Sequence, residues 1–257
     1  MGEPSRVASA FSGANAYAQY AWLQRRVADH LAQHIRQQRT ASAQQVLEIG
    51  CGTGFLTEHL IADNPHADFL ITDISTQMVQ RCRTAMDQIN SPNSQTIHYA
   101  TMDGQHPSID TTYELIASSL AFQWFDDLDA SIALLSTQLE PGSMIAFSTL
   151  GAETFHQWRS ACKKANVPCA TPNYPEPDAL NNRLSKQATF WMHVERIHAE
   201  YPSAWPFLQE LRHIGAHRPR SERQPASTGR FRALLRRLEH LGNFQATYQI
   251  IYGILTV

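Results

Sequence analysis

The pattern of apolar and polar positions along this 257-residue chain predicts a layered α/β fold. Short, nearly continuous apolar runs are typical of strands that are buried on both faces. The predicted strands of the first half cover residues 46–49, 68–72, 96–101, 113–118 and 143–150. Helical spacing of apolar residues predicts helices at residues 55–62, 76–89 (with Ser75 as the N-cap) and 128–139. This alternation predicts a doubly wound parallel sheet.

After residue 150 the pattern changes, and the second half predicts more helices around two further strands. The two strands cover residues 188–197 and 244–257. The predicted helices cover residues 154–165, 203–214 and 228–241, with a short one capped by Asp178 that ends near Leu184. We therefore expect a seven-stranded, mostly parallel α/β sheet with a small helical insertion before the last strand.

The length of the chain predicts one domain with three parts. Residues 1–40 form aromatic-rich helices, which either cover a ligand pocket as a lid or pack on the outside of the sheet. Residues 45–150 form the nucleotide-binding core, and residues 151–257 form the other half of the sheet.

Three glycines follow the first predicted strand, and their spacing indicates the kind of ligand. Gly50, Gly52 and Gly54 lead into a helix, and a strand, glycine turn and helix N-terminus together bind nucleotides. In a dinucleotide fingerprint the third glycine would stand one position later, where this chain has Phe55. Glu48, just before the turn, would repel a phosphate but suits a cation. The stretch resembles motif I of the class I, Rossmann-like methyltransferases, which bind the sulfonium compound S-adenosyl-L-methionine.

Acidic residues at the ends of the next two strands fit the same ligand. Asp73 is placed to accept the ribose hydroxyls. Asp103 is placed to accept the adenine amino group, or it serves as a turn residue before Gly104. Met78 lies near the adenine or fills the core. The cofactor-binding residues predicted from this resemblance are Glu48, Gly50, Cys51, Gly52, Gly54, Asp73, Ile74, Met78, Asp103, Gly104 and Ser119.

Composition indicates the cellular location of the protein and the state of its cysteines. No apolar run reaches the ~18 residues of a membrane span, and the N-terminus lacks the apolar core of a signal peptide, so we expect a cytoplasmic protein. Four cysteines without C-x-x-C spacing indicate neither a zinc site nor a disulfide framework. We expect reduced thiols and no metal.

Charge is distributed unevenly along the chain. Residues 1–150 hold 7 Lys and Arg against 15 Asp and Glu, whereas residues 205–257 hold 8 Arg against 3 Glu. A basic end on an acidic body indicates either an acidic partner or a solvated helix face.

The whole chain resembles the malonyl-acyl-carrier-protein O-methyltransferases of biotin biosynthesis. The resemblance rests on motif I and on five further stretches, and the Pro-rich link at residues 166–177 does not match closely. These stretches are residues 11–17, 23–28, 119–124, 146–151 and 211–216, with residues 248–253 resembling the closing strand.

The resemblance implies methylation of the free carboxylate of a malonyl thioester. That carboxylate is ionised near pH 7, since a carboxylic acid titrates near ~4, so no general base is assigned. Positioning and exclusion of water are what the enzyme must supply. The substrate-positioning candidates are Tyr17, Trp124, Ser148, Thr149, Arg212 and His213.

The resemblance also implies that malonyl-acyl carrier protein docks on the arginine-rich segment 212–237. Coenzyme A stays open as the thioester carrier, as does the oligomeric state. One alternative is an O-methyltransferase of a small free polycarboxylic acid such as trans-aconitate, and another is a non-catalytic adenosylmethionine-binding scaffold. Nucleic-acid binding is disfavoured by the acidic body, and we expect no membrane partner.

Overall fold

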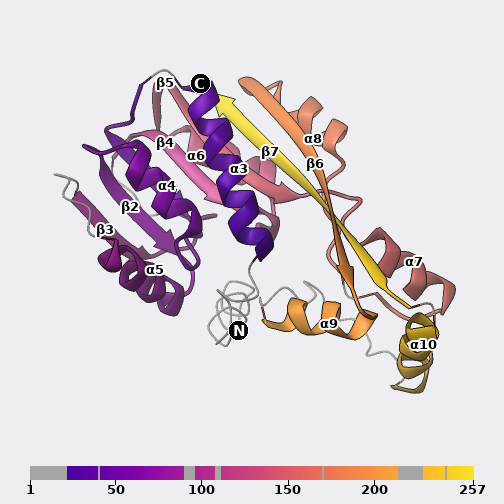
Figure 1. Ribbon diagram of the computed structural model, residues 1–257. Helices are drawn as coiled ribbons and strands as arrows, with labels where there is room; N and C mark the ends of the chain where they lie inside the picture. The colour runs from indigo at the N-terminus through magenta and orange to yellow at the C-terminus, as the bar shows by residue number, and fades with distance from the viewer. Residues whose placement is uncertain are drawn as a thin grey trace.

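A computed structural model describes residues 22–39, 41–89, 96–107, 111–169, 171–213, 228–240 and 242–257. These residues form one sheet in the order β3-β2-β1-β4-β5-β7-β6 (Figure 1). Its strands are β1 (Gln45–Ile49), β2 (Asp68–Asp73), β3 (Thr96–Thr101), β4 (Tyr113–Ser119), β5 (Leu139–Leu150), β6 (Thr189–Tyr201) and β7 (Phe244–Thr256). Within this sheet β7 runs opposite to the other six strands, so its pairs with β5 and β6 are antiparallel and the other four pairs are parallel. The predicted mostly parallel, seven-stranded α/β sheet is confirmed.

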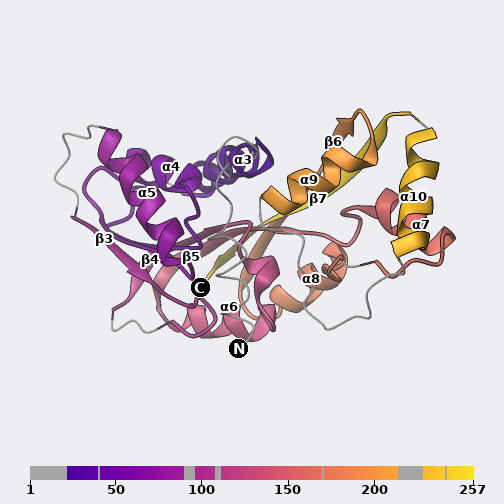
Figure 2. The same ribbon diagram turned by 90° about the horizontal axis from the view of Figure 1, so that it is seen from below.

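Helices cover both faces of the sheet (Figure 2). On one face lie α3 (Trp22–Gln38), α4 (Phe55–Asp63) and α5 (Thr76–Gln88), and on the other lie α6 (Leu128–Ser136) and α8 (Pro177–Leu184). The remaining helices are α7 (His156–Lys164), α9 (Ala204–His213) and α10 (Thr228–His240), with a 3-10 turn, η1, at Phe122–Trp124. The expected insertion before the last strand is therefore α9 and α10.

The apolar runs form strands because side chains on both faces of the sheet are buried. In β1, for example, Val46 belongs to the core under α3 and α4, and its neighbour Leu47 belongs to the core under α6. Helix α3 contributes a buried stripe that includes Leu31. Removing one such side chain costs roughly 2–5 kcal/mol when it leaves a cavity. The core therefore fixes the strand ends that carry the site.

The strands β6 and β7 project well beyond β5. Pairing of β5 with β7 ends at Leu150 and Ile250, whereas β6 and β7 stay paired to Tyr201 and Phe244. Figure 1 shows α7, α9 and α10 gathered around this projecting end. Aromatic rings pack there, with Phe207 against Phe244 at a centroid distance of 5.1 Å. This end carries the four arginines of α10, which are Arg230, Arg232, Arg236 and Arg237.

Four predicted boundaries are wrong. The helix expected to reach residue 139 ends at Ser136, and the strand expected to begin at residue 143 begins at Leu139, because Leu139 already pairs with Tyr113 of β4. Gly142, expected in a turn before this strand, lies within it with a φ of +83°. Asp178 is not the N-cap of α8, because Pro177 occupies the first helical turn and Glu176 precedes it as the cap. The strand predicted to end at residue 197 continues to Tyr201, which is buried.

Candidate functional site

The glycine turn after β1 has the backbone shape that only glycine adopts readily. Gly50, Gly52 and Gly54 have φ values of +76°, +54° and +95°. The amide of Gly50 donates a 2.8 Å hydrogen bond to the carbonyl of Thr72 at the end of β2. A Cβ on Gly50 would lie 2.4 Å from the Cβ of Ala121, so the turn also packs tightly on the segment after β4.

Asp73, at the tip of β2, holds this turn in place. Its Oδ2 accepts a 3.0 Å hydrogen bond from the amide of Gly52, and its Oδ1 accepts one of 2.8 Å from the amide of Ser75. Burial raises the pKa of this carboxyl group, although the two amides oppose the rise. The structure thus places Asp73, the residue predicted to bind the ribose, in direct contact with the glycine turn predicted to bind the cofactor.

Glu48 lies beneath the turn and is only 1% exposed. The hydroxyl of Thr57, in the first turn of α4, donates to its Oε2 over 2.6 Å. Burial raises the pKa of Glu48 to about 8, and nearby Asp73 adds to the rise. A buried carboxyl group of this kind is hard to ionise unless a positive charge comes close to it.

The loop after β3 closes the same edge of the sheet. The amide of Met102 donates to the carbonyl of Asp73 over 3.0 Å, which sets Asp103 beside the tip of β2. Asp103 Oδ1 accepts the amide of Gln105, as a turn residue does. A Cβ on Gly104 would lie 2.3 Å from Ile49, so only glycine fits at that position.

Two other predicted cofactor residues flank the start of α5. Ile74 is half-buried, whereas Met78 is 1% exposed and belongs to the core cluster under α3 to α5. Ser75 caps the helix, as predicted, by accepting the amide of Met78 on its hydroxyl. The packing role of Met78 is thus visible, and its place beside an adenine stays a prediction.

The end of β4 joins the end of β5 through two serines. Ser148 Oγ accepts the amide of Leu120 at 3.0 Å and lies 3.3 Å from the hydroxyl of Ser119. Leu120 has a φ of +50°, an unfavourable value for a leucine, and the side-chain amide of Gln123 donates to its carbonyl. Strained backbone beside a ligand turn is a frequent property of functional sites.

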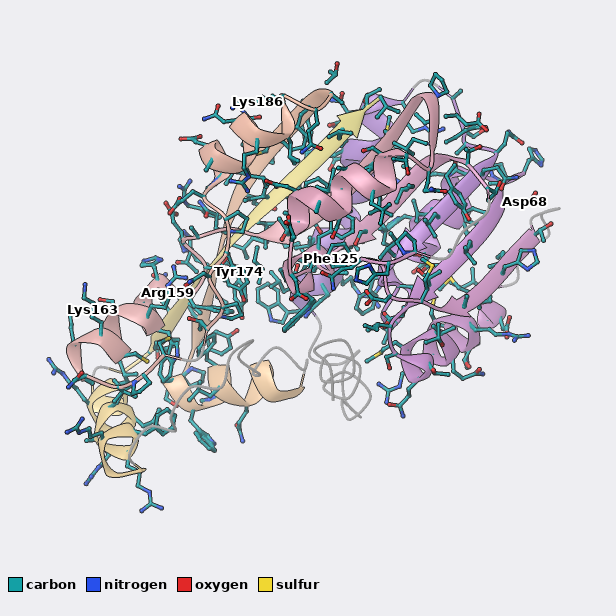
Figure 3. All side chains as sticks on the ribbon, turned by 180° about the vertical axis from the view of Figure 1, so that it is seen from behind. Asp68, Phe125, Arg159, Lys163, Tyr174 and Lys186 are labelled. Carbon is teal, nitrogen blue, oxygen red and sulfur yellow. The ribbon has the colours of Figure 1, made fainter. Side chains whose placement is uncertain are left out.

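The aromatic residues after β4 divide between the core and the surface. Phe122 is buried against Phe125 and Phe147 and so belongs to the core. Trp124 is half-buried. Figure 3 labels Phe125 at this edge and Asp68 at the opposite end of β2.

Of the remaining substrate-positioning candidates, the structure describes only the side chain of Thr149. Thr149 is buried and follows Ser148 along the strand, so it lies on the opposite face of the sheet. Tyr17 lies outside the described residues. Arg212 and His213 belong to the last turn of α9, and their side chains lie outside the described part of the structure.

A polar network between α3 and the last two strands was missed from the sequence. Glu195 of β6 accepts hydrogen bonds from the hydroxyl of Tyr252 at 2.9 Å and from Arg26 at 2.8 Å, and His30 Nδ1 lies 3.0 Å away. In register, Tyr252 stands opposite Ser148. A glutamate within the alternating pattern of residues 188–197 is the only sequence signal for this network.

No three His, Cys, Asp or Glu side chains gather as a metal site within the described residues. In the same part of the chain, no helix has the length and apolar character needed to cross a membrane.

Comparison with protein families agrees with this geometry. The family described as a methyltransferase domain matches residues 47–145, from β1 into β5. The malonyl-acyl-carrier-protein O-methyltransferase of Magnetococcus marinus is 35% identical over 254 residues, which cover 98% of this chain and 92% of that protein. The biotin biosynthesis bifunctional protein BioCD of Bordetella avium is 38% identical over 244 residues, which cover 94% of this chain and 50% of that protein.

Solved structures share the fold at low identity. A methyltransferase structure from Bacillus halodurans has a TM-score of 0.61 at 9% identity and covers 88% of this chain and 97% of its own. The YcgJ protein of Bacillus subtilis has a TM-score of 0.59 at 12% identity, with 89% and 99% covered. These two likenesses concern the fold alone.

Proposed function

The chain belongs to the malonyl-acyl-carrier-protein O-methyltransferase family, and we propose that it methylates the free carboxylate of malonyl-acyl carrier protein in biotin biosynthesis. The methyl donor is S-adenosyl-L-methionine. The observation that carries this proposal is the 35% identity, which runs through 98% of the chain and so includes the substrate side as well as motif I. The expected cytoplasmic location stays a prediction.

The residues around the glycine turn fit a cationic adenosyl cofactor. Glu48 is a buried carboxyl group, and a cation bound nearby would favour its ionised form. The hydroxyl of Thr53, within the turn, is buried and has no hydrogen-bond partner among the described residues, so a ligand group can engage it. Asp73 and Asp103 would hold the nucleoside part. When bound, S-adenosyl-L-methionine supplies an electrophilic methyl group.

The chain itself needs no general base for this reaction. The malonyl carboxylate is already ionised near pH 7, because such groups titrate near ~4. The protein has to hold one carboxylate oxygen in line with the methyl group, and positioning can supply on the order of 7–11 kcal/mol of a barrier. Attack neutralises both charges, so exclusion of water favours the transition state.

The edge formed by β4 and β5 is where the acceptor is expected. In folds of this kind ligands bind outside the carboxyl ends of the strands. Ser119 and Ser148 lie at that edge, and Trp124 follows in η1. The hydroxyl of Ser148 already accepts the amide of Leu120, so its first role is to hold that turn. The hydroxyl of Ser119 is therefore the better candidate to donate a hydrogen bond to the carboxylate that accepts the methyl group.

The projecting end offers a basic surface for an acidic carrier protein. Helix α10 packs on α7 through Phe231 and Trp158, whose ring centroids lie 6.3 Å apart. Among the described residues the exposed cations of these two helices are Lys163, Lys164, Arg230, Arg232, Arg236 and Arg237. No acidic residue occurs within α7. Acyl carrier proteins are acidic in general, so we take this surface as the docking site.

Two alternatives remain to be separated by substrate choice. A methyltransferase of a free polycarboxylic acid would need the same edge but no extended basic surface. A non-catalytic scaffold would bind the cofactor without turnover.

One experiment distinguishes these functions. The protein is incubated with labelled S-adenosyl-L-methionine and, in parallel, with malonyl-acyl carrier protein, malonyl-coenzyme A, malonate and trans-aconitate. We expect the fastest transfer to malonyl-acyl carrier protein. Transfer to the free acids alone would refute the proposal, and cofactor binding without any transfer would favour the scaffold.

A further inference from the structure

Two cysteines form a pair at the projecting end of the molecule, outside the site described above. Cys162 lies in α7 and is 1% exposed, whereas Cys169, in the link after that helix, is partly exposed. The amide of Val167, two residues before Cys169, donates to the carbonyl of Cys162 over 2.9 Å, so the link turns back on α7 and brings the two thiol groups together. One of the two sulfur atoms can therefore meet a small reagent from solvent while the other stands beside it.

The surroundings of Cys169 favour its thiolate form. The hydroxyl of Thr171 lies 3.2 Å from its Sγ. The hydrogen bond from the Cys162 thiol lowers the pKa of Cys169 to about 6, with further help from Thr171 and from the positive charge of Arg159, while burial opposes them. Cys162 has a raised pKa and keeps its proton. A thiolate next to a protonated thiol is the arrangement of a reactive cysteine with its resolving partner.

Arg159 is fixed in this position by the backbone. Its guanidinium group donates to the carbonyl of Ala152, and the amide of Ala152 donates to the carbonyl of Pro175 over 3.0 Å. Figure 3 labels Arg159 on α7 and Tyr174 in the link that follows this helix. The cation and the thiol pair thus belong to one fold unit, formed by α7 and the link.

We propose that Cys169 is a site of oxidative modification by peroxides and that Cys162 resolves the product to a disulfide. The Cys169 sulfur attacks one peroxide oxygen, the O–O bond breaks, and hydroxide leaves as a sulfenic acid forms. The Cys162 sulfur then attacks the sulfenic sulfur, the S–O bond breaks, and water leaves as the S–S bond forms. In total two thiols lose two electrons and two protons, and one hydrogen peroxide becomes two waters.

The other two cysteines provide an internal comparison. Cys51 and Cys82 also lie close together, but both are buried, and the Sγ of Cys82 lies 3.3 Å from the hydroxyl of Thr57. The bond to Cys82 and burial raise the pKa of Cys51. Both of these thiols are buried, whereas Cys169 is partly exposed, so we expect this pair to stay reduced under conditions that oxidise the first pair.

The test is peroxide treatment of the native full-length protein at neutral pH, followed by denaturation, alkylation with iodoacetamide and peptide mass spectrometry. We expect a peptide pair joined through Cys162 and Cys169 that has lost two hydrogens, with Cys51 and Cys82 alkylated. Equal oxidation of all four cysteines, or preferential joining of Cys51 to Cys82, would overturn the proposal. So would full alkylation of Cys162 and Cys169.

Two variants keep the result interpretable. In Cys162→Ser, Cys169 should stop at the sulfenic acid and be trapped by dimedone, whereas Cys169→Ser should leave Cys162 reduced. Trapping at Cys162 in the second variant would reverse the assigned roles and so overturn the proposal.

A rate measurement on the native protein needs no variant at all. Alkylation of Cys169 by iodoacetamide should rise with pH through about 6 and level off near neutrality. A rate that keeps rising to about 8.5, as for an ordinary thiol, would contradict the proposal.

Discussion

The backbone amide of Gly52 donates a 3.0 Å hydrogen bond to Oδ2 of Asp73, so the glycine turn and the tip of β2 form one rigid unit. Asp73→Ala removes the acceptor for this amide and for that of Ser75. We expect a loss of roughly 1–3 kcal/mol in the free energy of unfolding, because buried donors are left unsatisfied. Affinity for S-adenosyl-L-methionine should fall at least about tenfold, since that factor corresponds to only ~1.4 kcal/mol. Calorimetry of unfolding and of binding measures both.

Asp68→Asn is the matched control for this substitution, because Asp68 stands at the exposed start of the same strand. It should change neither quantity. Unaltered cofactor binding in Asp73→Ala would remove Asp73 from the cofactor site.

Alanine substitutions at Gly50 and Gly142 distinguish the cost of backbone strain from the cost of a steric clash. Both have positive φ, but a Cβ at Gly50 would meet Ala121 at 2.4 Å, whereas a Cβ at Gly142 would meet nothing within 4 Å. Gly142→Ala should cost only about 1–2 kcal/mol of unfolding free energy, from the left-handed backbone alone. Gly50→Ala should cost more and should also weaken cofactor binding. Equal costs in urea unfolding would show that the contact with Ala121 is unimportant.

Glu48 should make the stability of the free protein fall as the pH rises. Burial raises its pKa from 4.5 to about 8, so its contribution is fully present below pH 4.5 and is lost as the pH rises through 8. Glu48→Gln mimics the protonated form and escapes this loss. The difference in the free energy of unfolding between Glu48→Gln and the wild type should therefore shift in favour of the variant by on the order of 4 kcal/mol between pH 5 and 8, because each pKa unit corresponds to about 1.4 kcal/mol.

Urea unfolding at several pH values measures this difference between Glu48→Gln and the wild type. A difference that does not change with pH would mean that the carboxyl group is ionised in the folded protein.

Glu195 should show the opposite pH dependence. Burial opposes its ionisation, but hydrogen bonds from Tyr252, Arg26 and His30 outweigh this and lower its pKa. Its stabilising contribution is therefore present above the unfolded pKa, near ~4.3, and is lost as the pH falls through the lower folded pKa. Glu195→Gln should destabilise the protein at pH 7 and progressively less in acid, as followed by thermal unfolding.

Glu153→Gln is the matched control for Glu195. Glu153 also pairs with an arginine, Arg196 at 2.6 Å, but on the surface, where such pairs contribute little. If Glu195→Gln and Glu153→Gln lower the thermal stability equally, the hydrogen bond from Tyr252 does not stabilise the protein.

The cofactor side of the molecule could be predicted from the sequence because its contacts are local. The glycine turn, Asp73 and the Ser75 cap all fall within one strand–turn–helix sequence and its neighbour, and each residue type has one dominant use there. Met78 shows the limit, since an apolar residue that fills the core and one that lines a pocket give the same pattern in the sequence.

The network of Glu195 could not be predicted, for a different reason. Its partners Tyr252 and Arg26 stand 57 and 169 positions away along the chain, and no local pattern links them. The same is true of Gly151, where a Cβ would lie 2.4 Å from the side-chain oxygen of Gln249. Such pairs depend on the register of β6 and β7 against β5, which apolar patterning alone does not fix.

The proposed docking surface predicts a defect that is specific to malonyl-acyl carrier protein as the substrate. Arg236→Glu in α10 should raise KM for malonyl-acyl carrier protein about fivefold or more, with little change in kcat and none in cofactor affinity. The KM of the wild type should also rise with salt. Lys186→Glu makes the same change of charge at an exposed residue near the end of α8, away from this surface (Figure 3), and should have no effect. A KM that responds equally to both variants would show only an effect of net charge.

The position of the transferred methyl group tests the central claim most directly. Malonyl-acyl carrier protein is treated with the enzyme and methyl-labelled S-adenosyl-L-methionine, and the intact product is fragmented in a mass spectrometer. We predict that the label lies on the terminal malonyl carboxyl group as a methyl ester. Label on a side chain of the carrier protein, or none on the malonyl group while a free acid is methylated, would contradict the account.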